Sequence, residues 1–564
     1  MNEIKINKPK ILLALLPFWT PLIPPQGLSR LKGYLQMHGY RVKTADLNLE
    51  GEFRKLHNSY FEVLRRYIPE NKHGNIYNIG NDAWRDHMMA HINYEDEARY
   101  VELVKIIIYK VFYHQLEDSQ VRELNGILTM LYNKLEEHFL DLLETEKPDV
   151  LGLSVYRDTL PASLFVFRLT RKKYPGIMTI MGGNVFTIHL VPGSPNMEFF
   201  LEETKDYIDK IVMGEGEKIL LKILEEKPAD SKRLYTKADI DGKTLGFVPL
   251  ENLDFSDFNP YNYHYMAAQG SSSCPNHCSF CNVTTFYGEY REKDPVRTVE
   301  EMVQLNRTYG CKVFHMMDSL LNDVVTDIAR EFIKRDITLY WDGYFRVPAS
   351  CPKDMALLWR KGGFYRARIG VESGSQRVLN LMNKGITVDQ IRETISNLAS
   401  AGIKTTAYIV IGHPGETEED FQQTLDLIEE LKTDIWEAEC NPFTYFYSGQ
   451  GRSDEWEAKR ILLYPPWAKD MLITQTWIVN DTPKREEMFG RIYRFVEHCK
   501  RLGVAIPWSV LDVNHSDERW HRLHKNAVPR LFDLMKKNEY RDEDKDVKET
   551  IKAKYIVDEK EFEF

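Results

Sequence analysis

Short apolar runs that alternate with helical patterns restrict the fold of this chain more than any other feature of its sequence. Leu28, Leu31 and Leu35 recur at helical spacing, and a second helical pattern starts at Pro161. Strands that alternate with helices pair in parallel, so we expect an α/β fold with a doubly wound, Rossmann-like sheet that binds ligands at the carboxyl ends of its strands. The runs expected to form strands are Lys10–Phe18, Arg41–Ala45, Val150–Val155, Met178–Met181 and Lys210–Met213.

A largely helical segment, from about residue 53 to residue 146, interrupts this alternation. Apolar residues recur at three- and four-residue steps between Leu124 and Leu142, which is typical of an amphipathic helix. Tyr100–Phe112 is apolar over most of its surface, so we expect it to be buried. We interpret the segment as a helical cap over the first sheet.

Three cysteines, Cys274, Cys278 and Cys281, follow one another at the spacing C-x3-C-x2-C. Thiolates are the usual ligands of iron–sulfur clusters, so this loop can hold three irons of a cubane cluster and leave the fourth iron open. The alternatives are a zinc knuckle or three incidental core cysteines. A zinc site needs a fourth ligand nearby, and His277 lies inside the motif, where it cannot easily complete a tetrahedron.

Length, charge and the other cysteines limit the class of protein that carries this loop. A length of 564 residues favours two to four domains, and a net charge of -10 disfavours binding to nucleic acid. The sequence has no apolar run of roughly 18 residues, so we expect no membrane span. Four further cysteines stand singly, which predicts free thiols in a reducing cytoplasm, although a folded chain can still gather them around an auxiliary cluster. They are Cys311, Cys351, Cys440 and Cys499.

Two sets of motifs resemble known families. The cysteine motif with Phe280, and the stretch from Arg366 to Gln376 with Glu372 and Ser373, resemble the radical S-adenosylmethionine (SAM) superfamily. Four loops upstream resemble the cobalamin-binding domain found ahead of many radical SAM modules. Those loops are Pro17–Gly27, Ser154–Leu160, Gly182-Gly183 and Gly214-Glu215-Gly216. Over about residues 8–440, the chain therefore resembles a cobalamin-dependent radical SAM enzyme.

The radical SAM resemblance implies a partial (β/α)6 barrel over residues 251–440, with a 4Fe-4S cluster on the three cysteines and SAM at the open iron. Asp318 would bind the amino group of SAM. Arg346 or Arg368 would pair with its carboxylate, unless each arginine forms a structural ion pair. His413 would face SAM or substrate, unless hydrogen bonds hold it within its loop. The implied SAM-binding residues are Phe280, Asp318, Arg346, Arg368, Glu372, Ser373 and His413.

The upstream resemblance implies a cobalamin site with an unusual lower face. Cobalamin domains with a protein ligand carry Asp-x-His-x-x-Gly after the second strand, but here Asn48 stands at the histidine position. An amide is a poor cobalt ligand, so we expect base-off cobalamin without a histidine ligand. The alternative is a domain that binds nothing and only packs. The implied cobalamin-binding residues are Pro17, Trp19, Pro24, Gln26, Asn48, Ser154, Tyr156, Arg157, Thr159, Gly182, Gly183, Asn184, Gly214, Glu215 and Gly216.

Beyond residue 441 the alternation weakens. Helical patterns at Arg485–Leu502 and Asp517–Lys536 predict a mostly helical carboxyl-terminal domain that shapes substrate entry. The expected domains are thus residues 1–250 for cobalamin, 251–440 for the radical SAM core and 441–564. Tyr344 and Tyr445 are the candidate substrate contacts.

The resemblance implies a methyltransferase acting on an unactivated carbon of a peptide or protein side chain or of a small molecule. A 5′-deoxyadenosyl radical would take a hydrogen atom from that carbon, and methylcobalamin would supply the methyl group. An electron donor such as flavodoxin or ferredoxin would be a partner. One alternative keeps both cofactors but performs a non-methylating rearrangement or cyclisation. Another is a corrinoid-binding carrier or sensor.

Overall fold

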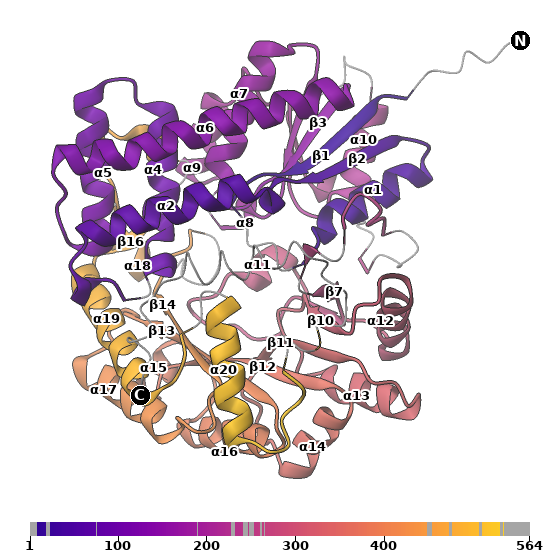
Figure 1. The fold of residues 1–564 in the computed structure, drawn as a ribbon, viewed down its shortest axis with the longest axis vertical. Coiled ribbons are helices and arrows are strands. Elements are labelled where there is room, and N and C mark those ends of the chain that lie inside the picture. The colour runs from indigo at the N-terminus through magenta and orange to yellow at the C-terminus, as the bar shows by residue number, and fades with distance from the viewer. Residues whose placement is uncertain are drawn as a thin grey trace, which may run out of the picture.

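The computed structural model describes residues 8–18, 23–74, 76–188, 190–226, 232–240, 246–247, 253–259, 262–263, 265–447, 454–472, 477–506, 510–530 and 534. Two parallel sheets, each with its own helices, make up most of the molecule (Figure 1). The amino-terminal unit, indigo to magenta, lies above the second unit, pink to orange, and the short helix α11 (Val283–Tyr287) lies between them. No helix in the described ranges is long and apolar enough to cross a membrane.

The first sheet is parallel and has the strand order β2-β1-β3-β4-β5-β6. Its central strands β1 and β3 are apolar and buried except for Lys10 and Ser154 at their ends, because helices cover both faces, which confirms the expected doubly wound α/β fold. The order reverses between β1 and β3, and such a switch point opens a binding crevice at the carboxyl ends of the two strands. The strands are β1 (Lys10–Leu15), β2 (Arg41–Asp46), β3 (Val150–Ser154), β4 (Met178–Gly182), β5 (Lys210–Val212) and β6 (Leu234–Tyr235).

Helices of the first unit come from two sources. Those between its strands are α1 (Gln26–Met37), α7 (Leu160–Lys173), α9 (Pro195–Glu203) and α10 (Glu217–Glu225). The insertion between β2 and β3 is helical, as the sequence predicts, and α5 buries most of its apolar side chains. Its main helices are α2 (Gly51–Tyr67), α4 (Asn81–Asn93), α5 (Glu97–Phe112) and α6 (Asp118–Glu146).

The second sheet contains six parallel strands in the order β14-β13-β12-β11-β10-β7. Neighbours in this sheet follow one another along the chain, with a helix after each of the central strands, which is the topology expected of a partial (β/α)6 barrel. The strands are β7 (Met266–Ala268), β10 (Val313–Met316), β11 (Tyr340–Arg346), β12 (Phe364–Glu372), β13 (Lys404–Ile411) and β14 (Glu437–Pro442). The helices are α12 (Pro295–Tyr309), α13 (Val325–Lys334), α14 (Lys353–Lys361), α15 (Gln376–Leu381), α16 (Val388–Ser400) and α17 (Glu418–Glu430).

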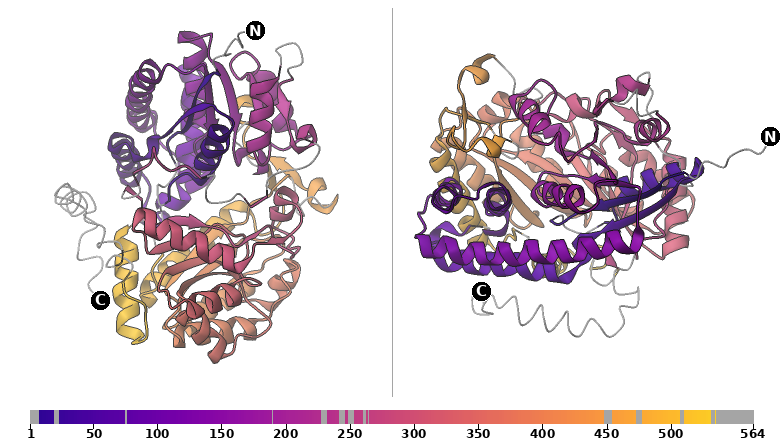
Figure 2. Two further views of the ribbon diagram at one scale, coloured as in Figure 1. Left: turned by 90° about the vertical axis from the view of Figure 1, so that its right-hand side faces the viewer. Right: turned by 90° about the horizontal axis from the view of Figure 1, so that it is seen from above.

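The carboxyl-terminal helices pack against both units. Helix α19 (Arg485–Leu502) has the predicted bounds, but the second predicted helix, Asp517–Lys536, is wrong: α20 spans Val510–Leu523. Pro529 falls inside the predicted range, and proline has no N–H for a helical hydrogen bond. Helix α20, yellow, lies along the second unit (Figure 2). A small hairpin pairs β15 (Arg460–Leu462) with β16 (Trp477–Val479).

Candidate active site

The three cysteines of the C-x3-C-x2-C motif lie on one loop that follows β7. A short hairpin of β8 (Ser271–Ser272) and β9 (Arg291–Glu292) flanks this loop, and α11 follows it. Cys278 is buried, whereas Cys274 and Cys281 are half-buried. Burial raises the pKa of Cys281, and the nearby thiolates of Cys278 and Cys274 raise it further. The three thiols are thus close enough to interact electrostatically, which fits a shared anionic cluster.

Several donors face the cysteine sulfurs. Arg346 donates from Nη1 to Cys278 Sγ at 3.4 Å, and Asn276 donates its backbone N–H and its Nδ2 to Cys274 Sγ at 3.5 and 3.4 Å. Donors in these positions can hydrogen-bond the cysteine sulfurs of a bound cluster. No three His, Cys, Asp or Glu side chains in the described residues converge on a point that suits one metal ion. Cubane thiolates bind different irons and need no such convergence.

Asp318 holds the start of the cysteine loop. Its side chain is buried at the end of β10, and both carboxylate oxygens accept the Gly270 N–H, at 3.0 and 3.1 Å. Burial raises the pKa of Asp318 to about 7, although the hydrogen bonds from Ser271 and Gly270 oppose that shift. The carboxylate that the sequence assigns to the SAM amino group is therefore engaged with the backbone, and its contact with SAM stays a prediction.

The two candidate arginines have different surroundings. Arg368 forms an ion pair with Asp342, with Nε and Nη2 at 2.9 and 2.8 Å from Oδ2, and His315 Nδ1 lies 2.7 Å from Oδ1. Burial alone would raise the pKa of Asp342, but the charges of Arg368 and His315 hold it well below its usual range. Arg368 is thus held in a structural pair, which is the alternative that the sequence left open. Arg346, beside Cys278, remains the candidate for the SAM carboxylate.

Glu372 and the cysteine loop meet at Lys384, a residue that the sequence reasoning missed. Glu372 ends β12 at a bulge with φ of +66°, and its Oε1 lies 2.5 Å from Lys384 Nζ. The same ammonium lies 5.8 Å from the centre of the Phe280 ring. Ser373 is buried, and its hydroxyl lies 3.2 Å from that of Thr424 on α17. No local pattern marks Lys384, because its partners come from elsewhere in the chain.

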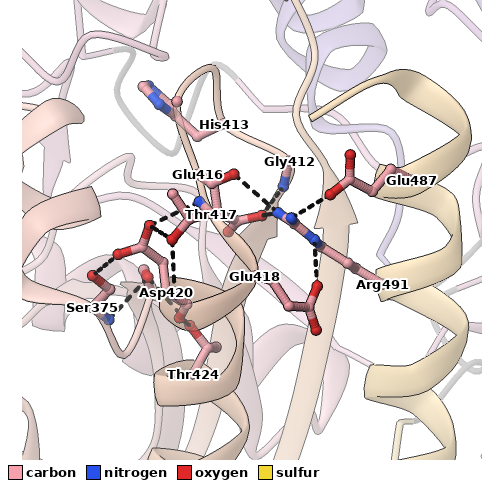
Figure 3. Close-up of polar contacts among 12 residues, drawn as sticks. Ser375, Gly412, His413, Glu416, Thr417, Glu418, Asp420, Thr424, Glu487 and Arg491 are labelled. Carbon is pink, nitrogen blue, oxygen red and sulfur yellow. Dashed lines mark hydrogen bonds and ion pairs between the residues drawn. The ribbon is translucent and has the colours of Figure 1, made fainter. Parts of the chain in front are cut away.

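His413 is buried, and its side chain points away from Arg491 (Figure 3). Its ring packs against Phe443 and Trp456, and Nδ1 lies 2.9 Å from the Pro414 carbonyl. Burial lowers the pKa of His413 to about 4, so the ring is neutral. These contacts favour the loop-held alternative over a side chain that faces SAM.

The loop after β2 holds Asn48 by its side chain. Asn48 is buried, and its Nδ2 donates to Asp46 Oδ1 at 2.7 Å and to the Leu16 carbonyl at 3.3 Å. Pro17 follows β1, Pro24 is buried, and Gln26 is the first residue of α1, whereas Trp19 lies outside the described residues. Pro17 and Asn48 therefore lie at the carboxyl ends of neighbouring strands.

The loop after β3 is shaped by its own contacts. Thr159 is buried, and its hydroxyl accepts the Tyr156 N–H at 3.0 Å and lies 3.3 Å from the Tyr156 carbonyl, so it braces the turn. Arg157 lies 3.2 Å from Asp82 of the helical insertion. A Cβ at Gly183, where φ is +114°, would lie 2.4 Å from the Val155 carbonyl. These residues build the loop, while Ser154, Gly182 and Asn184 lie at the ends of β3 and β4.

The loop after β5 offers an open backbone surface. Gly214 has φ of +98°, and a Cβ there would meet no atom within 4 Å. Glycine is thus favoured by the backbone, and the space beside it is free for a ligand. Glu215 lies next to it and pairs with Arg291 of β9 at 3.3 Å, and Gly216 precedes α10. This open strand end fits a corrinoid that approaches the sheet edge.

Contacts between the units bring the two sets of loops together. Besides the Glu215–Arg291 pair, Tyr263 donates to Asp46 Oδ2 at 3.0 Å. Burial raises the pKa of Tyr156 to about 12, and the phenol of Tyr287 on α11 adds to that rise. The strand ends at Asp46 and Glu215 therefore lie against the second unit.

The two candidate substrate residues are placed differently. Tyr344 is 42% exposed on the inner side of β11, with its ring 5.9 Å from that of Tyr408 and 6.1 Å from that of His315. Tyr445 is only 4% exposed. Tyr344 thus presents its side chain at the surface and Tyr445 does not, and a substrate contact of either residue stays a prediction.

Comparisons with known proteins agree with this arrangement. Residues 118–224 match the B12 binding domain, and residues 270–428 match the Radical SAM superfamily. The anaerobic magnesium-protoporphyrin IX monomethyl ester cyclase of Rubrivivax gelatinosus is 26% identical over 53% of this chain and 57% of its own. An uncharacterized methyltransferase of Pyrococcus horikoshii is 24% identical over 51% of this chain and 65% of its own. The chain thus spans between about half and two thirds of these relatives.

A solved structure shares the fold over nearly the whole chain. The radical SAM methyltransferase TsrM of Kitasatospora setae, with cobalamin and a [4Fe-4S] cluster bound, superposes with a TM-score of 0.57 at 14% identity. The match covers 94% of this chain and 99% of TsrM. The chain therefore carries a B12-binding domain ahead of a radical SAM domain, and it shares its overall fold with TsrM.

Proposed function

We propose that the chain is a methyltransferase that transfers a methyl group to an unactivated carbon of a peptide, a protein side chain or a small molecule. The contact that carries the proposal is the Glu215–Arg291 pair, because it holds the open strand end at Gly214 against the hairpin beside the cysteine loop. A corrinoid at that strand end would lie next to the cluster loop. TsrM, which shares the fold, is a methyltransferase.

The chain's own residues would bind and orient the reactants. When bound, the cluster, SAM and cobalamin supply radical initiation and the methyl group. Cys274, Cys278 and Cys281 would hold three irons, and Arg346 would neutralise the SAM carboxylate beside Cys278. The Glu372–Lys384 pair would present an acceptor to the ribose hydroxyls. The protein would act in a reducing cytoplasm, and flavodoxin or ferredoxin would be its electron donor.

Product analysis tests the methyl transfer. The reduced protein is incubated anaerobically with cobalamin, deuterated-methyl SAM and an extract of the source organism, and the products are measured by mass spectrometry. We expect S-adenosylhomocysteine beside 5′-deoxyadenosine, and the deuterated methyl group in one product. Deoxyadenosine without S-adenosylhomocysteine would overturn the proposal. That result would favour a cyclisation or rearrangement, which the name of the Rubrivivax relative makes the second candidate.

Cobalamin bound to this protein should be base-off, with no protein imidazole on cobalt. Asn48 stands at the ligand position, and its amide is bound to Asp46 and the Leu16 carbonyl. Electron paramagnetic resonance of the cob(II) form should show no nitrogen hyperfine splitting from a histidine. The variant Asn48→His provides the control, since a new imidazole there can introduce that splitting. Nitrogen splitting in the wild-type protein would contradict the prediction.

A further inference from the structure

The loop after β13 is closed by a carboxylate. Gly412 donates its backbone N–H to Glu416 Oε2 at 2.9 Å, and the Glu416 N–H donates to the His413 carbonyl at 2.9 Å (Figure 3). Gly412 and Gly415 have φ of +84° and +88°, conformations that favour glycine. We call residues 412–416 the β13 loop. Its shape depends on the position of one buried side chain, Glu416.

Arg491 of α19 holds that side chain from outside the radical SAM match. Its Nη1 lies 2.8 Å from Glu416 Oε2 and donates to the Glu416 carbonyl at 3.2 Å, and both side chains are 2% exposed. Nη2 donates to Glu487 Oε1 at 2.6 Å, and Nε lies 3.4 Å from Glu418 Oε2. The guanidinium thus contacts both the side-chain carboxylate and the backbone carbonyl of Glu416. These contacts fix the backbone and the side chain of that residue.

The β12 end is tied to the same region. Ser375 donates to Asp420 Oδ1 at 2.6 Å, and the Gly374 N–H donates to Thr424 Oγ1 at 2.9 Å. Asp420 and Thr424 belong to α17, which starts directly after the β13 loop and is capped by Thr417. Helix α17 therefore couples the strand end that carries Glu372 and Ser373 to the loop that Arg491 holds.

Helix α19 also contacts the helical insertion of the first unit. Tyr493 donates to the Val111 carbonyl at 3.1 Å, and the rings of Phe489 and Tyr113 are 6.0 Å apart. Met488 of the same helix packs on Gly412 so closely that a Cβ there would lie 2.3 Å from Met488 Cγ. Helix α19 thus packs against the helical insertion on one side and against the β13 loop on the other.

We propose that Arg491 is a positioning residue for SAM: it sets the β13 loop, and through α17 the β12 end, in the conformation that binds SAM. The inference rests on the proposed function, in which Glu372 at the β12 end binds SAM. It assigns to α19 a role in cofactor binding that lies beyond the radical SAM match at residues 270–428.

The charge of Glu416 explains how Arg491 would act. Burial raises the pKa of Glu416 to about 7, and the Gly412 N–H and Arg491 oppose that shift. Without Arg491 the pKa would rise further, and the carboxyl would be protonated at neutral pH. A neutral carboxyl is a weaker acceptor for the Gly412 N–H than a carboxylate. The loop would then lose both the cation and the strength of its closing hydrogen bond.

Binding of SAM to cluster-loaded protein tests the inference without any turnover. For Arg491→Met, we expect SAM to dissociate with a Kd roughly tenfold higher in equilibrium dialysis, within the range of coupling between contacting residues. Hydrogen exchange should accelerate at the amides of residues 412–416. Arg494→Met is the matched control: Arg494 lies on the same helix, is exposed, and pairs with Glu418 at 2.7 and 2.9 Å. It should change Kd by less than about twofold.

Two further variants separate positioning from general folding. Arg491→Lys keeps the charge but not the fork, and should weaken SAM binding less than Arg491→Met. In a Glu416→Gln background, Arg491→Met should have a smaller effect on Kd, because the amide there carries no charge that Arg491 maintains. Unchanged SAM binding in Arg491→Met with a normal cluster spectrum would overturn the inference, as would equal weakening by Arg494→Met. Because the assay measures binding, a failure of methyl transfer would not affect it.

Discussion

Replacing Cys278 with alanine should abolish the iron–sulfur cluster and with it all cleavage of SAM. Cys278 is the buried member of the triad, and it accepts a hydrogen bond from Arg346. Two thiolates would remain, and an open iron at a defined corner requires three. After anaerobic reconstitution, we expect the iron and sulfide content and the visible absorption of the cluster to fall to background. No 5′-deoxyadenosine should form.

A matched variant at another cysteine separates this effect from general loss of structure. Cys311 is half-buried and its thiol lies 3.0 Å from the Val313 carbonyl, outside the cysteine loop. Cys311→Ala should keep a normal cluster and normal SAM cleavage. Cluster-dependent cleavage that survives in Cys278→Ala would refute the assignment of the triad. Loss of the cluster in Cys311→Ala would point to an unselective effect.

Replacing Lys404 with methionine should destabilise the second unit by about 3–5 kcal/mol, the usual effect of removing one member of a buried ion pair. Lys404 begins β13 and pairs with Asp517 of α20, and the two side chains are 0% and 2% exposed. Burial lowers the pKa of Lys404, and Asp517 opposes that shift. Without the ammonium, the Asp517 carboxylate would face the apolar interior near Trp436, whose ring centre lies 4.9 Å from Lys404 Nζ.

The double variant Lys404→Met/Asp517→Leu should recover most of that stability. Replacing both members of a buried pair by apolar residues of similar size is often neutral. The shift of the urea unfolding midpoint, read from a probe in the second unit, measures both variants. A single variant as stable as the wild-type protein would contradict the prediction. So would a double variant that is less stable than the single one.

Much of the fold could be predicted because parallel strands covered on both faces must be apolar along their length. A few consecutive residues are enough to recognise the runs at Lys10 and Val150 and the cysteine motif. The α20 prediction failed because a charged pattern was extended through Pro529. Helix α20 begins at Val510 and buries Ser516 and Asp517, and no local pattern shows that burial.

The site could be predicted only where a motif carries its own chemistry. The sequence does not distinguish the roles of Arg346 and Arg368. The structure does, because Arg368 of β12 pairs with Asp342 of the neighbouring strand β11. The sequence does not show that Asp318 accepts a hydrogen bond from the Gly270 N–H, because the two residues meet only in the fold. Lys384 and Arg491 went unnoticed since their partners, Glu372 and Glu416, are fixed by strand register and helix packing, not by spacing.

The packing of α19 against the β13 loop limits where this chain can be joined to a related chain in a chimera. The Radical SAM match ends at residue 428, yet Met488 covers Gly412 and Arg491 is buried against Glu416. A chimera joined at residue 428 would combine the β13 loop of one parent with the α19 of another. The unit that must be exchanged together is therefore larger than the region that matches the Radical SAM superfamily, and it extends to the end of α19 at Leu502.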